Sequence, residues 1–246
     1  MLPSGLLFEE PEFLLRHEVE EIGSYFSIIR SIAAGNHKPS KICTDIGIKQ
    51  TSIPKYLKTL IDLDILEREI PVTENNPERS KMSLYQIKDN FLRFWFQFVY
   101  PEHGRLELGQ SDYVLRRIKD NFIDNHVAHI YETVCRSELW RLAIAGELQF
   151  NKLGRWWNSK AEIDIVALDS TGDDIVFAEC KYRNQLMDAD VFYALLGKKE
   201  LVPWKIGERK EKFVLFSISG FTDRLQNLAS ERNDLLLVGE DGKLIK

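Results

Sequence analysis

Residues 161–183 read AEIDIVALDSTGDDIVFAECKYR, and this stretch decides the fold of the C-terminal half. Two apolar runs flank the dipeptide Thr171-Gly172, which predicts two antiparallel strands joined by a two-residue turn. Charged side chains recur at matching positions of the two runs, at Glu162, Asp164, Glu179 and Lys181. A purely structural hairpin does not need these charges, so they point to a chemical role.

The register that this turn sets places Asp164 opposite Glu179 and Glu162 opposite Lys181, all on one face. The same alternation puts apolar side chains on both faces: Val166, Leu168, Ile175 and Phe177 share the charged face, and Ile163, Ile165, Val176, Ala178 and Cys180 occupy the other. Strands that are apolar on both faces lie inside a sheet.

Two opposed carboxylates in apolar surroundings repel each other, so one takes up a proton or a cation lies between them. A hard divalent cation, Mg²⁺ or Mn²⁺, suits such oxygen ligands. The structural alternative is a Glu162–Lys181 salt bridge, with Asp164 protonated or solvated at a sheet edge.

The rest of the C-terminal half alternates helical and strand patterns. A helix near 110–124 precedes a second helical run that carries His126, His129 and Glu132, and further elements are expected at 147–157 (strand), 187–199 (helix), 212–219 (strand), 221–229 (helix) and 234–239 (strand). This order predicts a mixed sheet with helices on its faces. The two histidines are interpreted as ordinary polar helix positions, because residues three apart drift around a helix.

The N-terminal third predicts a winged helix-turn-helix. Helices are expected from His17 to Ala34, from Ser40 to Ile46, and from Thr51 or Ser52 to Asp64, with Pro54 in the last helix's first turn. The segments 65–71 and 82–89 read as two strands joined by a flexible tip at 72–81.

Local charge in this third favours contact with DNA. Residues 38–58 contain five lysines and one aspartate, a net charge of +4, although the whole chain carries −5. A winged helix places its third helix in the major groove and its wing against the backbone. The predicted DNA contacts are Lys38, Lys41, Lys49, Gln50, Thr51, Ser52 and Lys55, with Arg79 and Lys81 on the wing; a protein-docking winged helix with a solvated basic face is the alternative.

The segment 91–125 opens with the run FLRFWFQFVYPEHGR, which is too short and too interrupted to cross a membrane. Its nearly all-round hydrophobicity predicts a helix buried between two domains. The expected organisation is therefore a remnant of a preceding module (1–16), a winged-helix domain (17–90), an aromatic-rich helical bridge (91–125) and an α/β domain (126–246).

Composition excludes several classes of protein. The chain has 246 residues and 44% apolar residues, enough for real cores, and it has no apolar run long enough to span a bilayer or to serve as a signal peptide. Cys43, Cys135 and Cys180 are odd in number and far apart, so neither disulfides nor a zinc ribbon are expected. The expected compartment is the cytoplasm.

The spacing of Asp164 to Glu179-x-Lys181, on paired strands after a helix with Glu132, resembles the signature of the PD-(D/E)XK nucleases. This resemblance implies a restriction-endonuclease-like α/β domain in which Asp164, Glu179 and the Cys180 backbone carbonyl bind Mg²⁺ and Lys181 holds the attacking water. Glu132 would be the additional acid on the first helix. Ala161-Glu162 stands where a proline-acid pair is sometimes seen, so either Glu162 or Asp164 is the principal acid; Asp164 is favoured because it opposes Glu179.

Further blocks are similar to the C-terminal half of archaeal-type P-loop ATPases, in which a winged helix precedes a domain of nuclease-like fold. They are YFSIIRSIAAGNHKPSKI (25–42), YLKTLIDLDILEREIPV (56–72), YQIKDNFLRFWFQFVYP (85–101), GRWWNSKAEIDIVALD (154–169), AECKYR (178–183) and LFSISGFT (215–222). The sequence contains no GxxxxGK[ST] phosphate loop, so ATP binding by that route is not expected from this chain. Two interpretations stay open: the chain is part of a longer ATPase, or it is a stand-alone partner of a separate P-loop ATPase.

The sequence as a whole predicts a mixed α/β protein that binds DNA and hydrolyses phosphodiesters with Mg²⁺ or Mn²⁺. Arg155, next to two tryptophans, is a further candidate for phosphate contact. Two alternatives stay open: a non-catalytic DNA- or protein-binding module that uses a nuclease-like fold for assembly, and a transcription regulator that acts through the winged helix alone.

Overall fold

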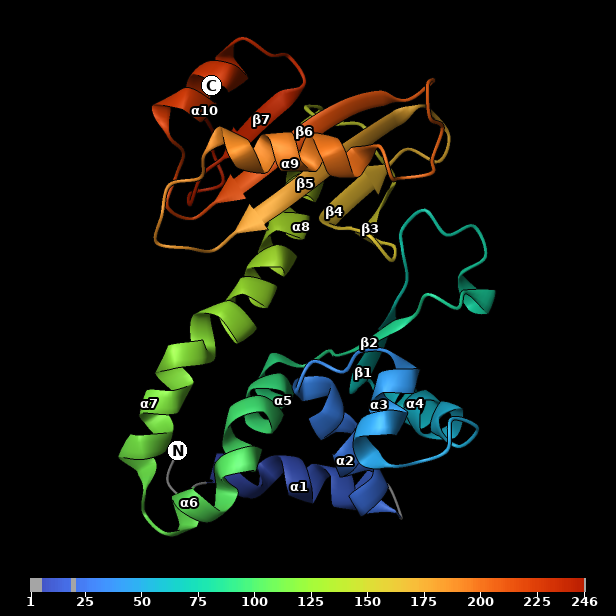
Figure 1. Ribbon diagram of the computed structural model, residues 1–246, viewed down its shortest axis with the longest axis vertical. Helices are drawn as coiled ribbons and strands as arrows, with labels where there is room; N and C mark the ends of the chain where they lie inside the picture. Colours follow the sequence, from blue (N-terminus) through green and yellow to red (C-terminus); the bar gives the residue numbers. More distant parts are fainter. Residues whose placement is uncertain (1–5, 19–20, 246) are drawn as a thin grey trace. The chain divides into compact units, whose positions relative to one another are not determined.

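A computed structural model describes residues 6–18 and 21–245, and Figure 1 shows their helices and strands in chain order. The chain divides into two compact units. Unit 1 comprises Met1–Glu69 and Ser83–His126, and unit 2 comprises Ile70–Met82 and Val127–Lys246. The division differs from the expected one, because residues 91–125 belong to unit 1 and residues 70–82 belong to unit 2. None of the described helices has the length and apolar character that a bilayer crossing requires.

Unit 1 contains short helices and one two-stranded sheet. Its elements are α1 (Leu6–Glu18), α2 (Ile22–Ala33), α3 (Pro39–Ile46), α4 (Ile53–Asp62), β1 (Leu66–Glu69), β2 (Leu84–Ile87), α5 (Asn90–Phe94), a π-helical turn (Trp95–Val99), a 3-10 turn (Tyr100–Glu102), α6 (His103–Glu107) and α7 (Ser111–Phe122). A second π-helical turn (Ile123–Val127) contains the boundary with unit 2. The helix predicted from His17 to Ala34 contains the whole of α2. Residues 19 and 20 of that prediction lie outside the described residues.

Local sequence explains the turn between α3 and α4. Pro39 starts α3, where its missing N–H costs nothing, and Gly47 ends it with a left-handed φ of 72°. Pro54 lies in the first turn of α4. The strands β1 and β2 then pair antiparallel, from Leu66 opposite Ile87 to Glu69 opposite Leu84. Three helices followed by a hairpin is the element order that the sequence predicted.

The loop between β1 and β2 belongs to unit 2 and packs at its first residues on β3 (Lys152–Trp157). The Val72 N–H donates to the Arg155 carbonyl oxygen at 3.0 Å, and the buried Val72 side chain belongs to a core cluster with Trp156. A Cβ atom at Gly154 would lie 3.2 Å from Val72 Cβ, so a glycine allows this approach. The expected flexible tip is thus anchored at its first residues, and a short 3-10 turn (Pro77–Arg79) follows.

The aromatic run lies in the core of unit 1. Trp95 and Phe96 are completely buried, and the Trp95 ring lies 6.2 Å from the Phe26 ring in an edge-on contact. The Trp95 indole N–H donates to the Phe8 carbonyl oxygen at 2.9 Å, which ties α1 to the same core. Burial was predicted, but these side chains pack with α1 and α2 of unit 1 instead of forming a bridge between domains.

Unit 2 is a six-stranded mixed sheet with helices on both faces. Its elements are α8 (Ala128–Ile144), β3 (Lys152–Trp157), β4 (Glu162–Leu168), β5 (Asp174–Lys181), α9 (Ala189–Lys199), β6 (Lys210–Ser217), α10 (Asp223–Ser230), β7 (Leu235–Val238) and β8 (Leu244–Ile245). The strand order is β3-β4-β5-β6-β7-β8. Strands β5, β6 and β7 are parallel and the other neighbours are antiparallel. The predicted mixed α/β sheet is confirmed.

The two faces of this sheet have separate cores. Helices α9 and α10 pack on the face that carries Ile175, Phe177 and Phe213, and Figure 1 shows α9 lying across the strands. Helix α8 packs on the opposite face, where Cys135 and Leu139 meet Val176 and other strand residues. Burial on both faces explains why β4 and β5 are nearly continuous apolar runs.

The pairing of β4 with β5 has the predicted register, from Ile165 opposite Ala178 to Leu168 opposite Ile175. The turn is longer than predicted. The Asp169 N–H donates to the Asp174 carbonyl oxygen at 2.9 Å, so the loop spans residues 170–173 instead of two residues. The predicted turn and the observed loop are both centred between Thr171 and Gly172, so the register of the two strands is the same in both.

A β-bulge interrupts β4 at the first residues of the strand. Gly154 of β3 pairs with Val166 and Trp156 pairs with Ile163, so β4 has one more residue than β3 over this interval. Asp164 and Ile165 of β4 lie opposite the single residue Arg155 of β3. Because a bulge shifts the alternation of side chains, Ile163 joins the α9 face and not the α8 face where the sequence placed it.

Candidate functional site

The bulge directs the Asp164 carboxylate toward β5. The ladder between β4 and β5 ends at Ile165 and Ala178, one step before Asp164 would face Glu179. Beyond that point Asp164 Oδ2 accepts a hydrogen bond from the Cys180 N–H at 2.9 Å. Asp164 is buried, with 8% of its surface exposed. Bulges often re-aim a side chain beside an active site, and here the result is a carboxylate held against the end of β5.

Glu179 is the most deeply buried acid of the group, with 2% of its surface exposed. Its Oε2 accepts a hydrogen bond from Lys181 Nζ at 3.0 Å. Its Oε1 accepts a hydrogen bond from Lys198 Nζ, which reaches the site from α9. Lys181 Nζ also lies 3.7 Å from Asp164 Oδ2. We call Asp164, Lys181, Glu179 and Lys198 the acid–lysine cluster, in which charges of opposite sign alternate.

Burial and neighbouring charge perturb the cluster. Burial raises the pKa of the Glu179 carboxyl, Asp164 raises it further, and the two lysines oppose this rise. Burial alone would lower the pKa of the Lys181 ammonium, but the charges of Asp164 and Glu179 outweigh it, so the pKa is raised. Perturbed groups that converge in this way mark a functional-site candidate.

The Cys180 side chain points to the opposite face of β5, into the core under α8. Burial raises the pKa of its thiol strongly, and Cys135, Asp164 and Glu132 raise it further. Glu132 lies on α8, the helix that packs on the Cys180 face of the sheet. Its role as the additional acid stays a prediction.

Glu162 lies outside the acid–lysine cluster. It is the first residue of β4 and pairs with Trp157 of β3. Its side chain is 63% exposed, and its Oε2 lies 3.4 Å from Arg155 Nη2. The alternative salt bridge from Glu162 to Lys181 is wrong, because Lys181 contacts Asp164 and Glu179 instead. Arg155 is correspondingly engaged with Glu162, with only 17% of its side chain exposed.

Lys198 is the residue of the cluster that sequence reasoning missed. It lies at the last turn of α9, three residues after the completely buried Leu195. A lysine three residues after a buried leucine lies on the side of the helix that faces the sheet, from which its ammonium can reach a buried acid. That spacing is present in the sequence, but the partner is far away along the chain.

The residues predicted to contact DNA are exposed. Lys38 precedes α3, Lys41 lies on it, and Lys49 to Ser52 form the turn that leads into α4, where Lys55 follows. Within the described residues none of these lysines forms an ion pair, so their charges are directed to solvent. Arg79 and Lys81 are also exposed, but they lie in unit 2.

His126 is not an ordinary polar helix position. It is buried against Phe122, with the two rings stacked 5.3 Å apart, and burial and the charge of Arg93 lower its pKa. His129 lies on α8 in unit 2. The first of these histidines therefore serves the aromatic core of unit 1.

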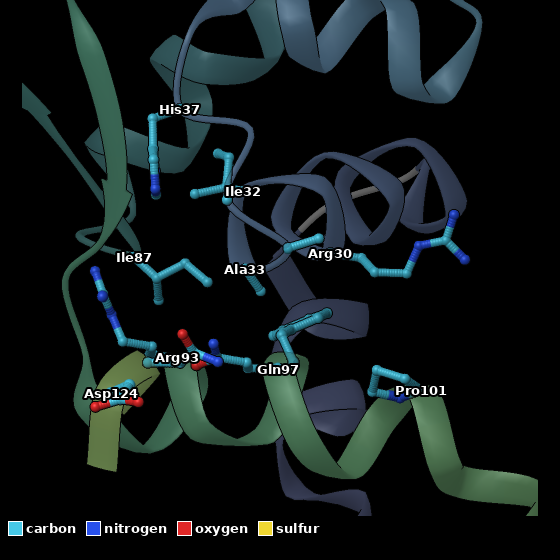
Figure 2. Close-up of a pocket in the computed structure, with 13 residues that line it drawn as sticks. Arg30, Ile32, Ala33, His37, Ile87, Arg93, Gln97, Pro101 and Asp124 are labelled. Atoms are coloured by element: carbon cyan, nitrogen blue, oxygen red, sulfur yellow. The ribbon is translucent and has the colours of Figure 1, made fainter. Parts of the chain in front are cut away.

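A separate cavity of about 400 Å³ opens in unit 1 (Figure 2). Its wall includes the end of α2, Ile87 of β2, Arg93 of α5 and Gln97 of the π-helical turn. Arg93 is buried and donates from Nη2 to Gln86 Oε1 at 2.8 Å. None of the residues predicted for catalysis, metal binding or DNA contact lines this cavity.

The acid–lysine cluster offers oxygen donors of the kind that Mg²⁺ binds: two carboxylates and the Cys180 carbonyl. Protein sites for Mg²⁺ commonly supply one or two carboxylates and leave the remaining positions to water and phosphate. No group of three or more His, Cys, Asp or Glu side chains in the described part of the chain could hold a metal. The donors fit a cation that is completed by water and phosphate, provided that the lysines release the carboxylate oxygens.

Comparison with known proteins gives two matches. Residues 95–192 match the DUF234 family, described as "Archaea bacterial proteins of unknown function". An uncharacterized protein of Methanocaldococcus jannaschii, MJECL04, is 33% identical over an alignment of 213 positions that covers 77% of this chain and 47% of the relative. The chain thus spans about half the length of the curated relative it matches. The matched segment 95–192 includes Asp164, Glu179 and Lys181 and ends before Lys198.

Proposed function

We propose that this protein binds DNA through the basic face of unit 1 and hydrolyses phosphodiester bonds at the acid–lysine cluster of unit 2. The observation that carries the proposal is the convergence of Asp164, Glu179 and Lys181 at the end of paired strands, in the order of the PD-(D/E)XK signature. Lys181 contacts Glu179, which lies two residues before it on the same face of β5, and Asp164 of β4.

Asp164, Glu179 and the Cys180 carbonyl would hold the divalent cation. Bound there, the cation would polarise the phosphate and lower the pKa of a coordinated water. The two carboxylates keep Lys181 charged and fix its position, so the ammonium can donate to the attacking water or to a phosphate oxygen. Glu132, on α8, would be the additional acid of this site.

The test is an assay of purified protein on supercoiled, linear, branched and single-stranded DNA. We expect cleavage with Mg²⁺ or Mn²⁺, complete loss when EDTA removes the cation, and recovery when Mn²⁺ is added back. Cleavage that persists in EDTA, or a total lack of cleavage with every DNA form and both cations, would contradict the proposal.

DNA binding by unit 1 is tested separately. Each lysine that neutralises a phosphate adds about 0.9 to the slope of log affinity against log salt concentration. The double variant Lys49→Ala/Lys55→Ala should therefore reduce this slope by about 2 and weaken binding on all sequences alike. Fluorescence anisotropy with a labelled duplex at several salt concentrations measures both quantities.

The control for this experiment is Lys119→Ala, an exposed lysine on α7 outside the basic segment. It should leave the salt slope unchanged. Equal slopes for the wild type and the double variant would show that the basic turn does not contact phosphates, and the docking of a protein would then be the better interpretation of this surface.

A second function is favoured by one specific observation. Both oxygens of Glu179 accept hydrogen bonds from lysines, so the cluster is charge-balanced without a cation. A nuclease-like domain that serves only assembly would have this arrangement. Calorimetry separates the two functions, since the assembly function predicts no binding of Mn²⁺ that depends on Asp164 and Glu179.

A further inference from the structure

Glu179 is held by two cations that come from different elements. Lys181 lies two residues away on β5, whereas Lys198 reaches Glu179 Oε1 from α9. Only Lys181 belongs to the Asp…Glu-x-Lys pattern. The Lys198 side chain is 30% exposed, whereas the carboxylate that it contacts is almost completely buried.

The charges of the cluster balance, with two carboxylates and two ammonium groups. A divalent cation that binds Glu179 needs its carboxylate oxygens, but the ammonium groups of Lys181 and Lys198 already contact both of them. Coulomb repulsion at such distances is weakly screened, because the carboxylate lies inside the protein. One ammonium must therefore move away before the cation can bind Glu179.

We propose that Lys198 is an internal counter-ion that competes with the divalent cation for Glu179 Oε1. This inference rests on the proposed function, because it assumes that Glu179 is a metal ligand. In the absence of the cation, Lys198 neutralises the buried carboxylate and stabilises the sheet end. Its long, flexible side chain and its partial exposure allow the ammonium to turn to solvent when the cation arrives.

The competition predicts the direction of a binding change. Lys198→Met keeps the apolar stem and removes the charge, so the affinity for Mn²⁺ should increase by about tenfold. Lys198→Arg keeps the charge and should bind Mn²⁺ as the wild type does. Isothermal titration calorimetry with Mn²⁺ alone gives the dissociation constants, independent of any cleavage.

Lys199→Met is the matched control. Lys199 is the next residue on α9 and also forms ion pairs, but its partners are Glu200 and Glu211 and not Glu179. Its removal should leave the affinity for Mn²⁺ unchanged. Folding is checked by thermal unfolding: without a cation Lys198→Met should melt below the wild type, and saturating Mn²⁺ should raise its melting temperature more than that of the wild type.

The possible failures are distinct. Binding of Mn²⁺ that is equal or weaker in Lys198→Met, with normal binding by the wild type, overturns the competition and leaves the proposed function intact. Weaker binding would mean that Lys198 positions Glu179 for the cation. If neither the wild type nor any variant binds Mn²⁺, the metal site itself fails, and the proposed function fails with it.

Discussion

Asp164→Asn should reduce DNA cleavage by about a thousandfold, because it removes one of the two carboxylates that would hold the cation. The substitution is close to isosteric. An asparagine oxygen can still accept the hydrogen bond that Cys180 N–H donates to Asp164 Oδ2, so the end of β5 should keep its structure. Initial rates with Mn²⁺ over a range of cation concentrations measure the loss.

Glu162→Gln is the matched control for this substitution. Glu162 lies on the same strand, two residues before Asp164, but it is exposed and contacts Arg155. Its loss should change cleavage by less than about threefold, within the ordinary range for a surface substitution. If Glu162→Gln abolished cleavage and Asp164→Asn did not, Glu162 would be the principal acid, the alternative that the sequence left open.

The register of the hairpin could be predicted because it depends only on the centre of its turn. The loop at residues 170–173 is longer than the predicted dipeptide, but it is lengthened by one residue on each side. Opposed residues therefore stay opposed, and Ile165 faces Ala178 as expected. The symmetry brings the start of β4 beside the end of β5, and the bulge then sets how Asp164 meets Glu179 and Lys181.

The bulge at Asp164 could not be predicted from the alternation of β4. It depends on the pairing with β3, where Gly154 and Trp156 set the interval, and Gly154 in turn packs against Val72 from a distant loop. The same limit applies to Lys198, whose partner is decided by the crossing of α9 over β5. Local patterns identify strands and their faces, whereas these details depend on neighbours that are remote in sequence.

The aromatic run at residues 91–100 also separates what a local pattern predicts from what depends on residues that are remote in sequence. All-round hydrophobicity correctly predicted that Trp95 and Phe96 are buried, since no face of that segment could be left in water. Burial alone does not say which elements cover the segment. The partners proved to be α1 and α2, including Phe8 and Phe26, within a single unit.

Trp95→Ala should have the largest effect on stability, lowering the free energy of unfolding of unit 1 by about 4 kcal/mol. Trp95 has no exposed surface and lies against Phe26, Phe96 and Tyr100. Its loss leaves a cavity and deprives the Phe8 carbonyl oxygen of its donor. Hydrogen exchange read by mass spectrometry resolves unit 1 from unit 2 and should show faster exchange in α1 and α2.

Two variants separate packing from the hydrogen bond and from a general effect of losing tryptophan. Trp95→Phe keeps most of the ring and removes the donor to Phe8, so it should cost about 1 kcal/mol. Trp140→Ala in unit 2 removes a side chain that is 41% exposed and that contacts Phe150, and should cost less than Trp95→Ala.

If Trp95→Ala accelerated exchange in α2 but left α1 unchanged, the Trp95–Phe8 hydrogen bond would not hold α1 to this core. Faster exchange in both helices would establish α1 as a structural part of unit 1, because the shared core would then be what stabilises it.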